Sequence, residues 1–249
     1  MSKKIIFVLV LIIVIAGIGY WIYQSGPETK KPAESAKVAL SLKNCAYIIE
    51  GKKITLKDGY SEEEIAPGSA SKLITQYLGN EAPGDFNKDG LGDIAFILAQ
   101  DPGGSGAFYY IAVALGDVKG YQGTNAVLLG DRIALQNTEI QEGKIIVNYA
   151  DRKIDEAMTV LPSIGISRQF ALEGKTLKDV TPEEAKREQG CLLSGGTVET
   201  SLCCASASDF PNVCLIGACG CSPADSHQVK VCNCGEGKCF DGSGCVVVQ

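Results

Sequence analysis

The sequence predicts a mainly β protein with an N-terminal transmembrane helix, a compact antiparallel β domain and a small disulfide-rich C-terminal domain. Three observations lead to this fold class. An uncharged apolar run occupies residues 5–23, short β-prone runs bounded by glycine or aspartate fill residues 38–180, and ten of the 11 cysteines fall in residues 191–245. We expect the β domain to form a sandwich or a barrel-like sheet, with or without one short helix.

The N-terminus is expected to anchor the chain in a membrane. The run IIFVLVLIIVIAGIGYWIY, residues 5–23, contains no charge and no proline. As a helix that rises about 1.5 Å per residue it would span the roughly 30 Å hydrocarbon core, and its terminal aromatic residues suit the headgroup level. A cleaved signal peptide is the alternative, but Gly17 and Gly19 match an A-x-A-like cleavage site poorly. We therefore predict an uncleaved single-pass helix.

The orientation of this helix follows from the cysteines and not from the flanking charges. Lys3 and Lys4 on one side are balanced by Lys30 and Lys31 on the other. Disulfides persist in oxidising compartments, so the cysteine-rich C-terminus is expected outside the cytoplasm. The sequence thus predicts a protein of the cell membrane with the bulk of the chain on the extracytoplasmic side.

Changes in composition divide the chain into five segments. The stretch QSGPETKKPAESAK has the Pro, Gly, Ser and charge content of a solvated spacer. Further along, Thr181, Pro182 and Glu184 favour the start of a short helix. The predicted segments are an anchor at 1–23, a linker at 24–37, the β domain at 38–180, a connecting helix or linker at 181–190 and the cysteine-rich domain at 191–249.

The β domain is predicted to consist of strands separated by turns. Glu50 and Gly51 lie between two β-prone runs and predict a hairpin, whereas residues 70–79 fit a short helix or a strand. The acidic run at 62–64 is interpreted as a solvated turn. Two runs, IAFIL and YYIAVAL, are too apolar for strands with one wet face and should lie centrally, under a second layer. The other predicted strands are NAVLLG, IALQNTEI, KIIVNYA and SRQFAL.

The stretch GDFNKDGLGDIAF, residues 84–96, predicts a cation-binding loop. Counted from its first aspartate, oxygen-bearing side chains fall at positions 1, 3, 5 and 9, the carbonyl of position 7 is available, and Gly90 at position 6 tolerates a positive φ. Hard cations such as Ca²⁺ take oxygen ligands at this spacing. A turn held by Asp and Asn side chains without an ion is the alternative. The predicted metal ligands are Asp85, Asn87, Asp89, Leu91 and Asp93.

The same loop resembles the FG-GAP type of calcium loop, D-x-[DN]-x-D-G-x-x-D, which joins two strands in extracellular repeat proteins. Position 12 is Phe96 in place of the bidentate Glu of an EF-hand, and the run that follows is strand-like. Only one copy is present, without an internal period, so the propeller built by FG-GAP repeats does not carry over. The resemblance implies a weakly held structural ion.

Three stretches of the middle domain carry a wider similarity: NEAPGDFNKDGLGDIAFILAQDPGGSGAFYYIAVAL, LGDRI and GKIIVNYADRK. They are similar to an uncharacterised domain of exported bacterial and archaeal proteins, which implies export and a β-rich fold and brings no activity with it. CLIGACGCSP and CNCGEGKCFDGSGCV likewise resemble a cysteine-rich tail of exported prokaryotic proteins.

The C-terminal cysteines are predicted to form disulfides. Their segment has too few large apolar residues for an independent core, so covalent bonds or metal must hold it. Ten cysteines allow five disulfides whose pairing the sequence leaves open, although adjacent Cys203 and Cys204 should pair elsewhere. The candidates are Cys191, Cys203, Cys204, Cys214, Cys219, Cys221, Cys232, Cys234, Cys239 and Cys245.

A zinc site is the alternative for this segment. It would use the C-G-C and C-N-C pairs at 219–221 and 232–234 together with His227, but C-x-C fits the usual C-x₂₋₄-C spacing poorly. Disulfides are favoured because of the predicted location. Cys45 stands alone in the middle domain and is expected either to be buried as a small apolar residue or to link to another chain.

Charge and motifs argue against several functions. A net charge of −6 disfavours a phosphate-binding surface, so nucleic acid is not an expected partner. The DPGGSG stretch at 101–106 is predicted to be a turn that holds no nucleophile, because Ala107 breaks G-x-S-x-G. Asp131 and Arg132 are expected to form an ion pair at a turn, with a ligand clamp as the alternative. His227, the only histidine, lies in the cysteine-rich tail, so a Ser-His-Asp site would have to reach across two domains and is not expected.

Two functional classes remain. The favoured class is a non-catalytic binding module, tethered to the membrane through residues 5–23, that contacts an unknown protein or an envelope ligand. Tyr109, Tyr110 and Tyr121 would form its binding surface if they lie outside the core. The alternative is a calcium-supported extracytoplasmic hydrolase that uses Asp or Glu, which should show a cleft with a carboxylate pair and shifted pKa values. No catalytic residue is predicted, because no nucleophile and base stand at a recognisable spacing.

Overall fold

The computed structural model describes residues 41–215 and 219–248 of the chain. The predicted anchor and linker lie outside the described residues. All the elements below belong to one compact unit, Ala39–Gln249. Among the described residues, no helix is both long enough and apolar enough to cross a membrane.

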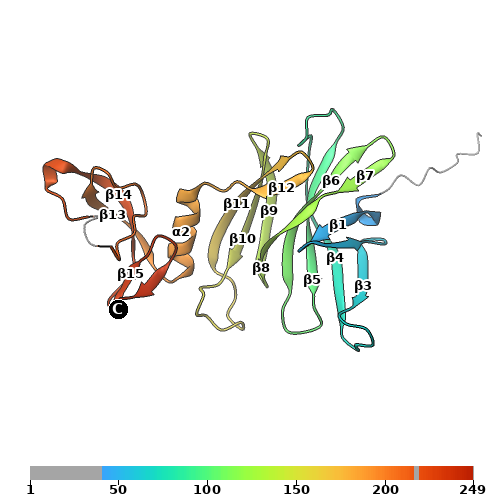
Figure 1. The fold of residues 1–249 in the computed structure, drawn as a ribbon, viewed down its shortest axis with the longest axis horizontal. Coiled ribbons are helices and arrows are strands. Elements are labelled where there is room, and N and C mark those ends of the chain that lie inside the picture. Colours follow the sequence, from blue (N-terminus) through green and yellow to red (C-terminus); the bar gives the residue numbers. More distant parts are fainter. Residues whose placement is uncertain (1–40, 216–218, 249) are drawn as a thin grey trace, which may run out of the picture. The chain divides into compact units, whose positions relative to one another are not determined.

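The described chain is mainly β, as predicted (Figure 1). The larger sheet contains β1 (Ala46–Ile49), β2 (Lys52–Thr55), β3 (Tyr60–Glu64), β4 (Lys72–Gly84), β5 (Asp93–Asp101), β6 (Phe108–Asp117), β7 (Gly120–Gly123) and β8 (Asn125–Asp131). The smaller sheet contains β9 (Ala134–Gln141), β10 (Lys144–Asp151), β11 (Ile164–Glu173) and β12 (Thr176–Asp179). The remaining elements are η1 (Leu42–Asn44), α2 (Glu183–Leu193), β13 (Thr197–Cys204), η2 (Pro223–Asp225), β14 (Ser226–Asn233), β15 (Lys238–Phe240) and β16 (Cys245–Val247).

The two sheets are almost entirely antiparallel. The larger sheet has the strand order β2-β1-β8-β6-β5-β4-β3, with β7 paired to β6, and the smaller one has the order β12-β11-β10-β9. The one parallel pair of these two sheets joins β1 to β8, where Ile48 lies opposite Asn125. Short loops connect most neighbours along the chain, which is why the close spacing of β-prone runs predicted an antiparallel sheet.

The main core lies between the two sheets. It takes side chains from β4, β5, β6 and β8 of the larger sheet and from β10, β11 and β12 of the smaller one. Its members are Ala82, Ala95, Ile97, Ile111, Val113, Leu115, Leu129, Ile133, Ile145, Val147, Tyr149, Ile166, Phe170 and Leu177. The packing of one sheet on the other is the sandwich or barrel-like arrangement that the sequence predicted.

Strands β5 and β6 are buried on both faces, as predicted for IAFIL and YYIAVAL. Ala95 and Ile97 belong to the main core, whereas Phe96 and Leu98 belong to a second core on the opposite face of the sheet. Successive side chains in a strand point to opposite faces, so a strand covered on both sides needs an unbroken apolar run.

The β1–β2 hairpin and η1 cover that second face. Tyr47 and Ile54 are fully buried in the second core, and the Tyr47 hydroxyl donates to the carbonyl of Leu42 at 2.7 Å. The hairpin turns at Glu50 and Gly51, with φ angles of 50° and 81°. Both angles lie in the left-handed region required by the tightest hairpin turns, so the predicted hairpin is confirmed.

Asparagine side chains of the larger sheet bind the backbone of both edge strands of the smaller sheet. On one side the Thr138 N–H of β9 donates to Asn80 Oδ1 of β4 at 2.9 Å. On the other side Asn125 of β8 donates to the Leu177 carbonyl of β12 at 3.0 Å and accepts from the Leu177 N–H at 2.7 Å. These bonds occupy backbone groups at sheet edges, and they bring the sandwich close to a closed barrel.

Two local expectations are resolved by this sheet. Residues 70–79 lie mostly in the long strand β4, so the strand is the correct alternative. The solvated turn predicted for Glu62, Glu63 and Glu64 is wrong, because these residues form the edge strand β3. Glu64 pairs directly across from Lys72, and a lysine opposite a glutamate offsets the poor strand propensity of the acidic run.

Helix α2 extends beyond its predicted end at residue 190. Pro182 is its N-cap, Glu183 begins the helix, and the last residue is Leu193, so Cys191 lies inside the helix. The Gln189 side chain donates to the carbonyl of Ser167 on β11 at 2.7 Å, and Leu193 packs against the main core. The helix is therefore packed on the β domain and also carries the first cysteine of the tail.

The tail has five disulfides, as predicted, and also a small core of its own, which the sequence did not predict. The buried residues of that core are Cys191, Phe210, Cys232 and Phe240, which come from α2, β14, β15 and the segment between β13 and β14. The bonded pairs are Cys191–Cys232, Cys203–Cys219, Cys204–Cys221, Cys214–Cys239 and Cys234–Cys245. Cys203 and Cys204 pair elsewhere, in agreement with the sequence. Four residues make too small a core to hold such a segment without covalent bonds.

Candidate functional site

The predicted cation loop connects β4 to β5, and its polar side chains fold back onto its own backbone. The Asp89 N–H donates to Asp85 Oδ1 at 3.2 Å and to Asn87 Oδ1 at 3.0 Å. The Gly90 N–H donates to Asp85 Oδ2 at 3.1 Å, and the Leu91 N–H donates to Asp89 Oδ1 at 2.8 Å. The Asp89 N–H donates to both Asp85 and Asn87, and Asp85 accepts from two N–H groups. The structure thus brings the predicted ligands Asp85, Asn87 and Asp89 together on one turn.

Gly90 has the left-handed conformation that its place in the motif requires. Its φ is 85°, and the residue two positions earlier, Lys88, also has a positive φ of 61°. Left-handed residues reverse the chain within a few positions, so the loop turns tightly around its N–H groups. The Leu91 side chain points outward and is 38% exposed. The group of Leu91 that could bind an ion in the loop is therefore its backbone carbonyl.

Asp93 occupies a different place from the other predicted ligands. Its side chain is fully buried, Oδ2 accepts from the Phe86 N–H at 2.8 Å, and Oδ1 accepts from the Gly116 N–H at 2.8 Å. Gly116 belongs to β6, so this carboxylate ties the loop to a central strand. Charge-assisted hydrogen bonds of this kind are about twice as strong as neutral ones.

The donor set suits a hard cation. The predicted ligands are carboxylate, amide and carbonyl oxygens, which Ca²⁺ prefers over nitrogen or sulfur. An oxygen that accepts one N–H keeps a further lone pair for an ion. The carboxylate oxygens of Asp85, Asp89 and Asp93 do not all lie within 4.8 Å of one another, whereas Asp85, Asn87 and Asp89 share the loop bonds above. The role of Asp93 as a direct ligand stays a prediction.

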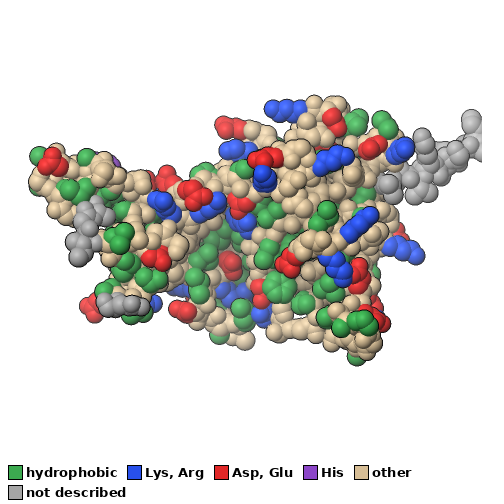
Figure 2. Space-filling model, viewed as in Figure 1, with side chains coloured by type: hydrophobic (Ala, Val, Ile, Leu, Met, Phe, Trp, Pro, Cys, Tyr) green, Lys and Arg blue, Asp and Glu red, His purple; other side chains and the backbone are tan. Residues whose placement is uncertain are grey.

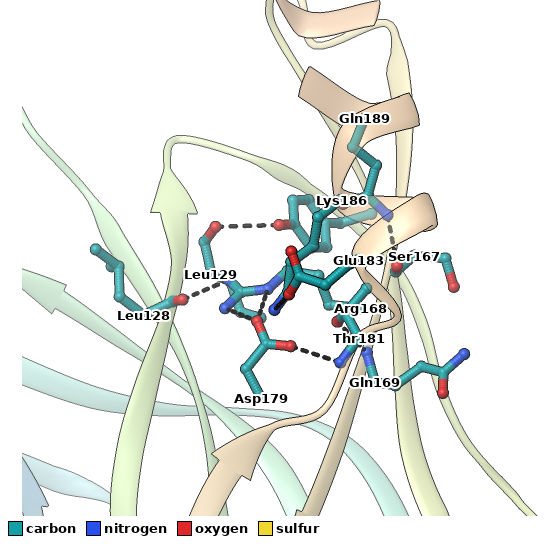
Figure 3. Close-up of polar contacts among 11 residues, drawn as sticks. Leu128, Leu129, Ser167, Arg168, Gln169, Asp179, Thr181, Glu183, Lys186 and Gln189 are labelled. Carbon is teal, nitrogen blue, oxygen red and sulfur yellow. Dashed lines mark hydrogen bonds and ion pairs between the residues drawn. The ribbon is translucent and has the colours of Figure 1, made fainter. Parts of the chain in front are cut away.

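A second polar cluster, around Arg168 of β11, was missed by sequence reasoning. Figure 3 shows the guanidinium directed at Asp179 and at the Leu128 carbonyl. Nε and Nη2 lie 3.0 and 2.7 Å from Asp179 Oδ2, and Nη1 donates to the Leu128 carbonyl at 2.6 Å. One side chain thus connects β11, β12 and β8 across the seam between the sheets. The alternation that places Phe170 inward also places Arg168 on that face, but its partners come from distant segments.

The charges around Arg168 are set by their neighbours. Burial acts to raise the pKa of Asp179, but hydrogen bonds from Thr181 and the Arg168 guanidinium outweigh it and hold that pKa below the usual value. Burial raises the pKa of Tyr149, whose hydroxyl donates to the Leu129 carbonyl at 3.1 Å. The cluster therefore contains an ionised Asp179 carboxylate and a neutral Tyr149 phenol, both hydrogen-bonded. Together with Arg168 they hold β8, β11 and β12 together.

The GDR turn forms the predicted ion pair. Arg132 Nη2 lies 2.9 Å from Asp131 Oδ2, and the Ala107 N–H donates to Asp131 Oδ1 at 2.8 Å. Burial acts to raise the pKa of Asp131, yet the bonds from Arg132 and Ala107 lower it overall. A groove of about 210 Å³ lies beside this turn, lined by Asp131, Asp151, Arg152, Lys153, Ile154, Glu156, Met158 and Leu193. DPGGSG begins at Asp101, the last residue of β5, and its other residues form most of the loop to β6, as expected of a turn.

The three tyrosines do not form one exposed surface. Tyr110 is 2% exposed in the second core, and its hydroxyl donates to Glu50 Oε1 at 3.1 Å, so a surface role for it is wrong. Tyr109 is partly buried against the main core. Tyr121 is partly buried against the second core and lines a groove of about 530 Å³ beside β1, β2 and β7. Cys45 is buried at this groove, where its thiol donates to the Tyr121 carbonyl at 3.0 Å.

The cysteines proposed for zinc are bonded to other partners. Cys219, Cys221, Cys232 and Cys234 all take part in disulfides. Among the described residues, the one group of three side chains with metal-binding atoms in mutual reach is Cys232, Cys234 and Cys245, and their sulfurs belong to two neighbouring disulfides. His227 is not a member of that group.

Comparison with known proteins adds no relative: no family model, curated protein or solved structure matches this chain.

Proposed function

We propose that this protein is a membrane-anchored, extracytoplasmic binding module with a structural calcium loop and a disulfide-stabilised tail. The observation that carries the proposal is the set of five disulfides within residues 191–245. Each disulfide in a small domain contributes about 2–5 kcal/mol, and such bonds persist only where thiols are oxidised. The apolar run at 5–23 supplies the anchor, with the cell membrane as its location.

The β4–β5 loop supports the calcium part of the proposal. Its turn places Asp85, Asn87 and Asp89 on one side of the backbone, and the buried Asp93 fixes the end of the loop to β6. The side chains of 85, 87 and 89 and the carbonyl of Leu91 would hold the ion. Bound Ca²⁺ would neutralise the clustered carboxylates and pin the loop between two strands, with an affinity on the order of 10⁻⁴ to 10⁻³ M as in extracellular modules.

The groove beside β1, β2 and β7 is the surface that best suits a ligand or a partner protein. Ile48 is 47% exposed there, and Tyr121 and Gly123 line the same groove of about 530 Å³. Lys53 adds one positive charge at its border. An open groove with apolar and aromatic walls and few charges fits a protein segment or an envelope component.

Surface charge supports the absence of nucleic acid among the partners. Figure 2 shows basic and acidic side chains interspersed over the face in view, with no broad patch of lysine and arginine. Together with the net charge of −6, this disfavours neutralisation of a phosphate backbone.

A calcium-supported hydrolase is the second candidate, and the groove at the GDR turn is what favours it. Asp131, Asp151 and Glu156 line that groove of about 210 Å³. General acid catalysis needs a carboxyl whose pKa is raised, whereas the pKa of Asp131 is lowered by Arg132 and Ala107 despite burial. Asp131 is thus engaged in holding the turn, and the binding module remains the better supported function.

Membrane topology tests the proposal. The full chain and a matched chain that lacks residues 5–23 would be produced in a bacterial host and fractionated. We expect the full chain in the membrane fraction, with its tail cleaved by protease added to spheroplasts and with ten tail thiols reactive only after reduction. The shortened chain should stay in the cytoplasm with those thiols free. A tail of the full chain that is protected in intact spheroplasts would contradict the proposal.

A further inference from the structure

Two disulfides of the tail lie in direct contact. The Cys232 sulfur, bonded to Cys191, lies 3.8 Å from the sulfur of Cys234 and 3.7 Å from the sulfur of Cys245. Cys234 and Cys245 are bonded to each other. These separations correspond to van der Waals contact, so one sulfur of the first disulfide touches both sulfurs of the second.

The backbone of Gly196 permits this contact. A Cβ at this position would lie 2.5, 2.8 and 3.0 Å from the sulfurs of Cys232, Cys191 and Cys245. Any other residue would push at least one of these sulfurs away. The three sulfurs therefore gather around one point that only a glycine leaves free.

The two disulfides differ in their access to solvent. Cys191 is 0% exposed and Cys232 is 4% exposed, whereas Cys234 and Cys245 are only partly buried. An external thiolate can therefore reach the outer pair, Cys234–Cys245, while the inner pair, Cys191–Cys232, is shielded. The inner pair can be reached only by a sulfur already inside the protein, and the outer pair supplies one.

We propose that these four cysteines form a thiol–disulfide exchange site that takes a small thiol or a protein thiol as its substrate. The incoming thiolate bonds to an outer cysteine, and the exchange is relayed to the inner pair. This inference depends neither on the calcium loop nor on the membrane anchor.

The exchange proceeds in two balanced steps. A thiolate attacks the Cys234 sulfur, the Cys234–Cys245 bond breaks, a mixed disulfide forms at Cys234, and Cys245 leaves as a thiolate. The Cys245 thiolate then attacks the Cys232 sulfur, 3.7 Å away, the Cys191–Cys232 bond breaks, and a Cys232–Cys245 bond forms. The proton of the incoming thiol ends on the buried Cys191 sulfur, where a charge is unfavourable. Two disulfide bonds exist before and after, so no oxidant or reductant is consumed.

Attack at Cys234 is favoured over attack at Cys245 by the short chain separation of Cys232 and Cys234. Release of Cys234 would require a new bond between Cys232, near the end of β14, and Cys234, one residue beyond that strand. In an extended backbone the Cα atoms of residues two positions apart are about 6.7 Å from each other, near the upper limit for a disulfide. Cys245 lies on β16 and carries no such restriction.

The exchange changes what the disulfides connect. Cys191 lies in α2, which packs on the β domain, and Cys232 lies in β14 of the tail. Before exchange a covalent bond joins α2 to β14, and after exchange that bond is absent while the new Cys232–Cys245 bond joins β14 to β16. Capture of a thiol partner would thus release the covalent link between helix and tail.

The test uses the full oxidised chain and an equimolar amount of reduced glutathione. After acid quench, free thiols are blocked with N-ethylmaleimide and the bonds are assigned by tandem mass spectrometry, with a sample lacking glutathione as reference for Cys45. We expect glutathione at Cys234, maleimide at Cys191 and a new Cys232–Cys245 bond in most of the modified molecules. Glutathione and maleimide confined to Cys234 and Cys245, with Cys191–Cys232 intact, would overturn the relay.

Two comparisons sharpen the result. Cys214–Cys239 is a partly buried disulfide for which no contact with a neighbouring disulfide is seen among the described residues. When glutathione is bonded to one cysteine of this pair, maleimide should therefore be found only on the other. A double variant, Cys191→Ser with Cys232→Ser, should carry maleimide at Cys245 when glutathione occupies Cys234. Equal labelling of Cys191 in molecules modified at Cys214 would show general scrambling and would also overturn the proposal.

Discussion

The carboxylate of Asp93 accepts the N–H of Gly116 at 2.8 Å in the interior of the protein, and this bond ties the β4–β5 loop to the central strand β6. The second oxygen of the same carboxylate accepts the Phe86 N–H at 2.8 Å, within the loop itself. A single residue at the start of β5 therefore sets the position of the loop that carries the predicted calcium ligands.

Asp93→Ala should destabilise the protein strongly, whether or not calcium is present. The substitution removes two charge-assisted hydrogen bonds and leaves the N–H groups of Phe86 and Gly116 without their acceptor, at a cost of about 2–4 kcal/mol. Urea denaturation of residues 38–249 in excess chelator measures this cost. Asp155→Ala, at an exposed position in the β10–β11 loop, is the control and should change the free energy of unfolding by less than about 0.5 kcal/mol.

Gly116→Ala should disrupt the same junction by a different mechanism. A Cβ on Gly116 would lie 2.5 Å from the carbonyl oxygen of Gly92, which is a backbone atom and cannot move aside cheaply. We expect a loss of about 2 kcal/mol or more in the free energy of unfolding. Gly92→Ala is the matched control, because its Cβ would meet nothing within 4 Å and its φ is not left-handed. Equal losses in the two variants would show that the close approach is not what requires glycine at 116.

Arg168→Met should make the protein less stable at neutral pH and less sensitive to acid. Asp179 has a folded pKa below its usual value of 3.8, so its stabilising contribution is present above pH 3.8 and is lost as the pH falls through the folded value. Without the guanidinium the folded pKa should move toward 3.8 or above it, and that contribution should shrink. Leaving the partly buried Asp179 without its partner should cost about 2 kcal/mol.

The measurement is the free energy of unfolding at several pH values for the wild type and the variant. The difference between the two should be largest at neutral pH and should narrow in acid. Arg168→Lys keeps the charge but not the planar fork that reaches Asp179 and the Leu128 carbonyl together, so it should recover only part of the loss. A difference that stays constant with pH would contradict the electrostatic role of Arg168.

Much of the fold could be predicted from the sequence because its signals are local. IAFIL and YYIAVAL are apolar on both strand faces, and that pattern by itself indicates a strand covered on both sides. Glu50 and Gly51 predicted the first hairpin because they lie between two β-prone runs, and in the structure both have positive φ angles. The density of cysteines near the C-terminus predicted disulfides because that segment has too few large apolar residues for a core and its predicted location favours disulfides over metal.

The unpredicted features depend on contacts between distant segments. Glu62, Glu63 and Glu64 have turn-like composition, but pairing with β4 and the lysine opposite Glu64 make them a strand. The partners of Arg168 lie 11 and 40 residues away, and no short motif encodes them. Disulfide pairing is likewise a property of the folded tail. At the candidate site the loop residues could be predicted from spacing, whereas the bond from Asp93 to β6 could not.

The most direct test of the proposed calcium site is a thermal melt of residues 38–249 in millimolar calcium and in excess chelator, for the wild type and for Asp89→Ala. The account predicts a melting temperature several degrees higher in calcium for the wild type, no calcium effect for Asp89→Ala, and an undiminished effect for Asp155→Ala. Identical melts of the wild type in calcium and in chelator would contradict it, and GDFNKDGLGDIAF would then be a turn held by its own side chains.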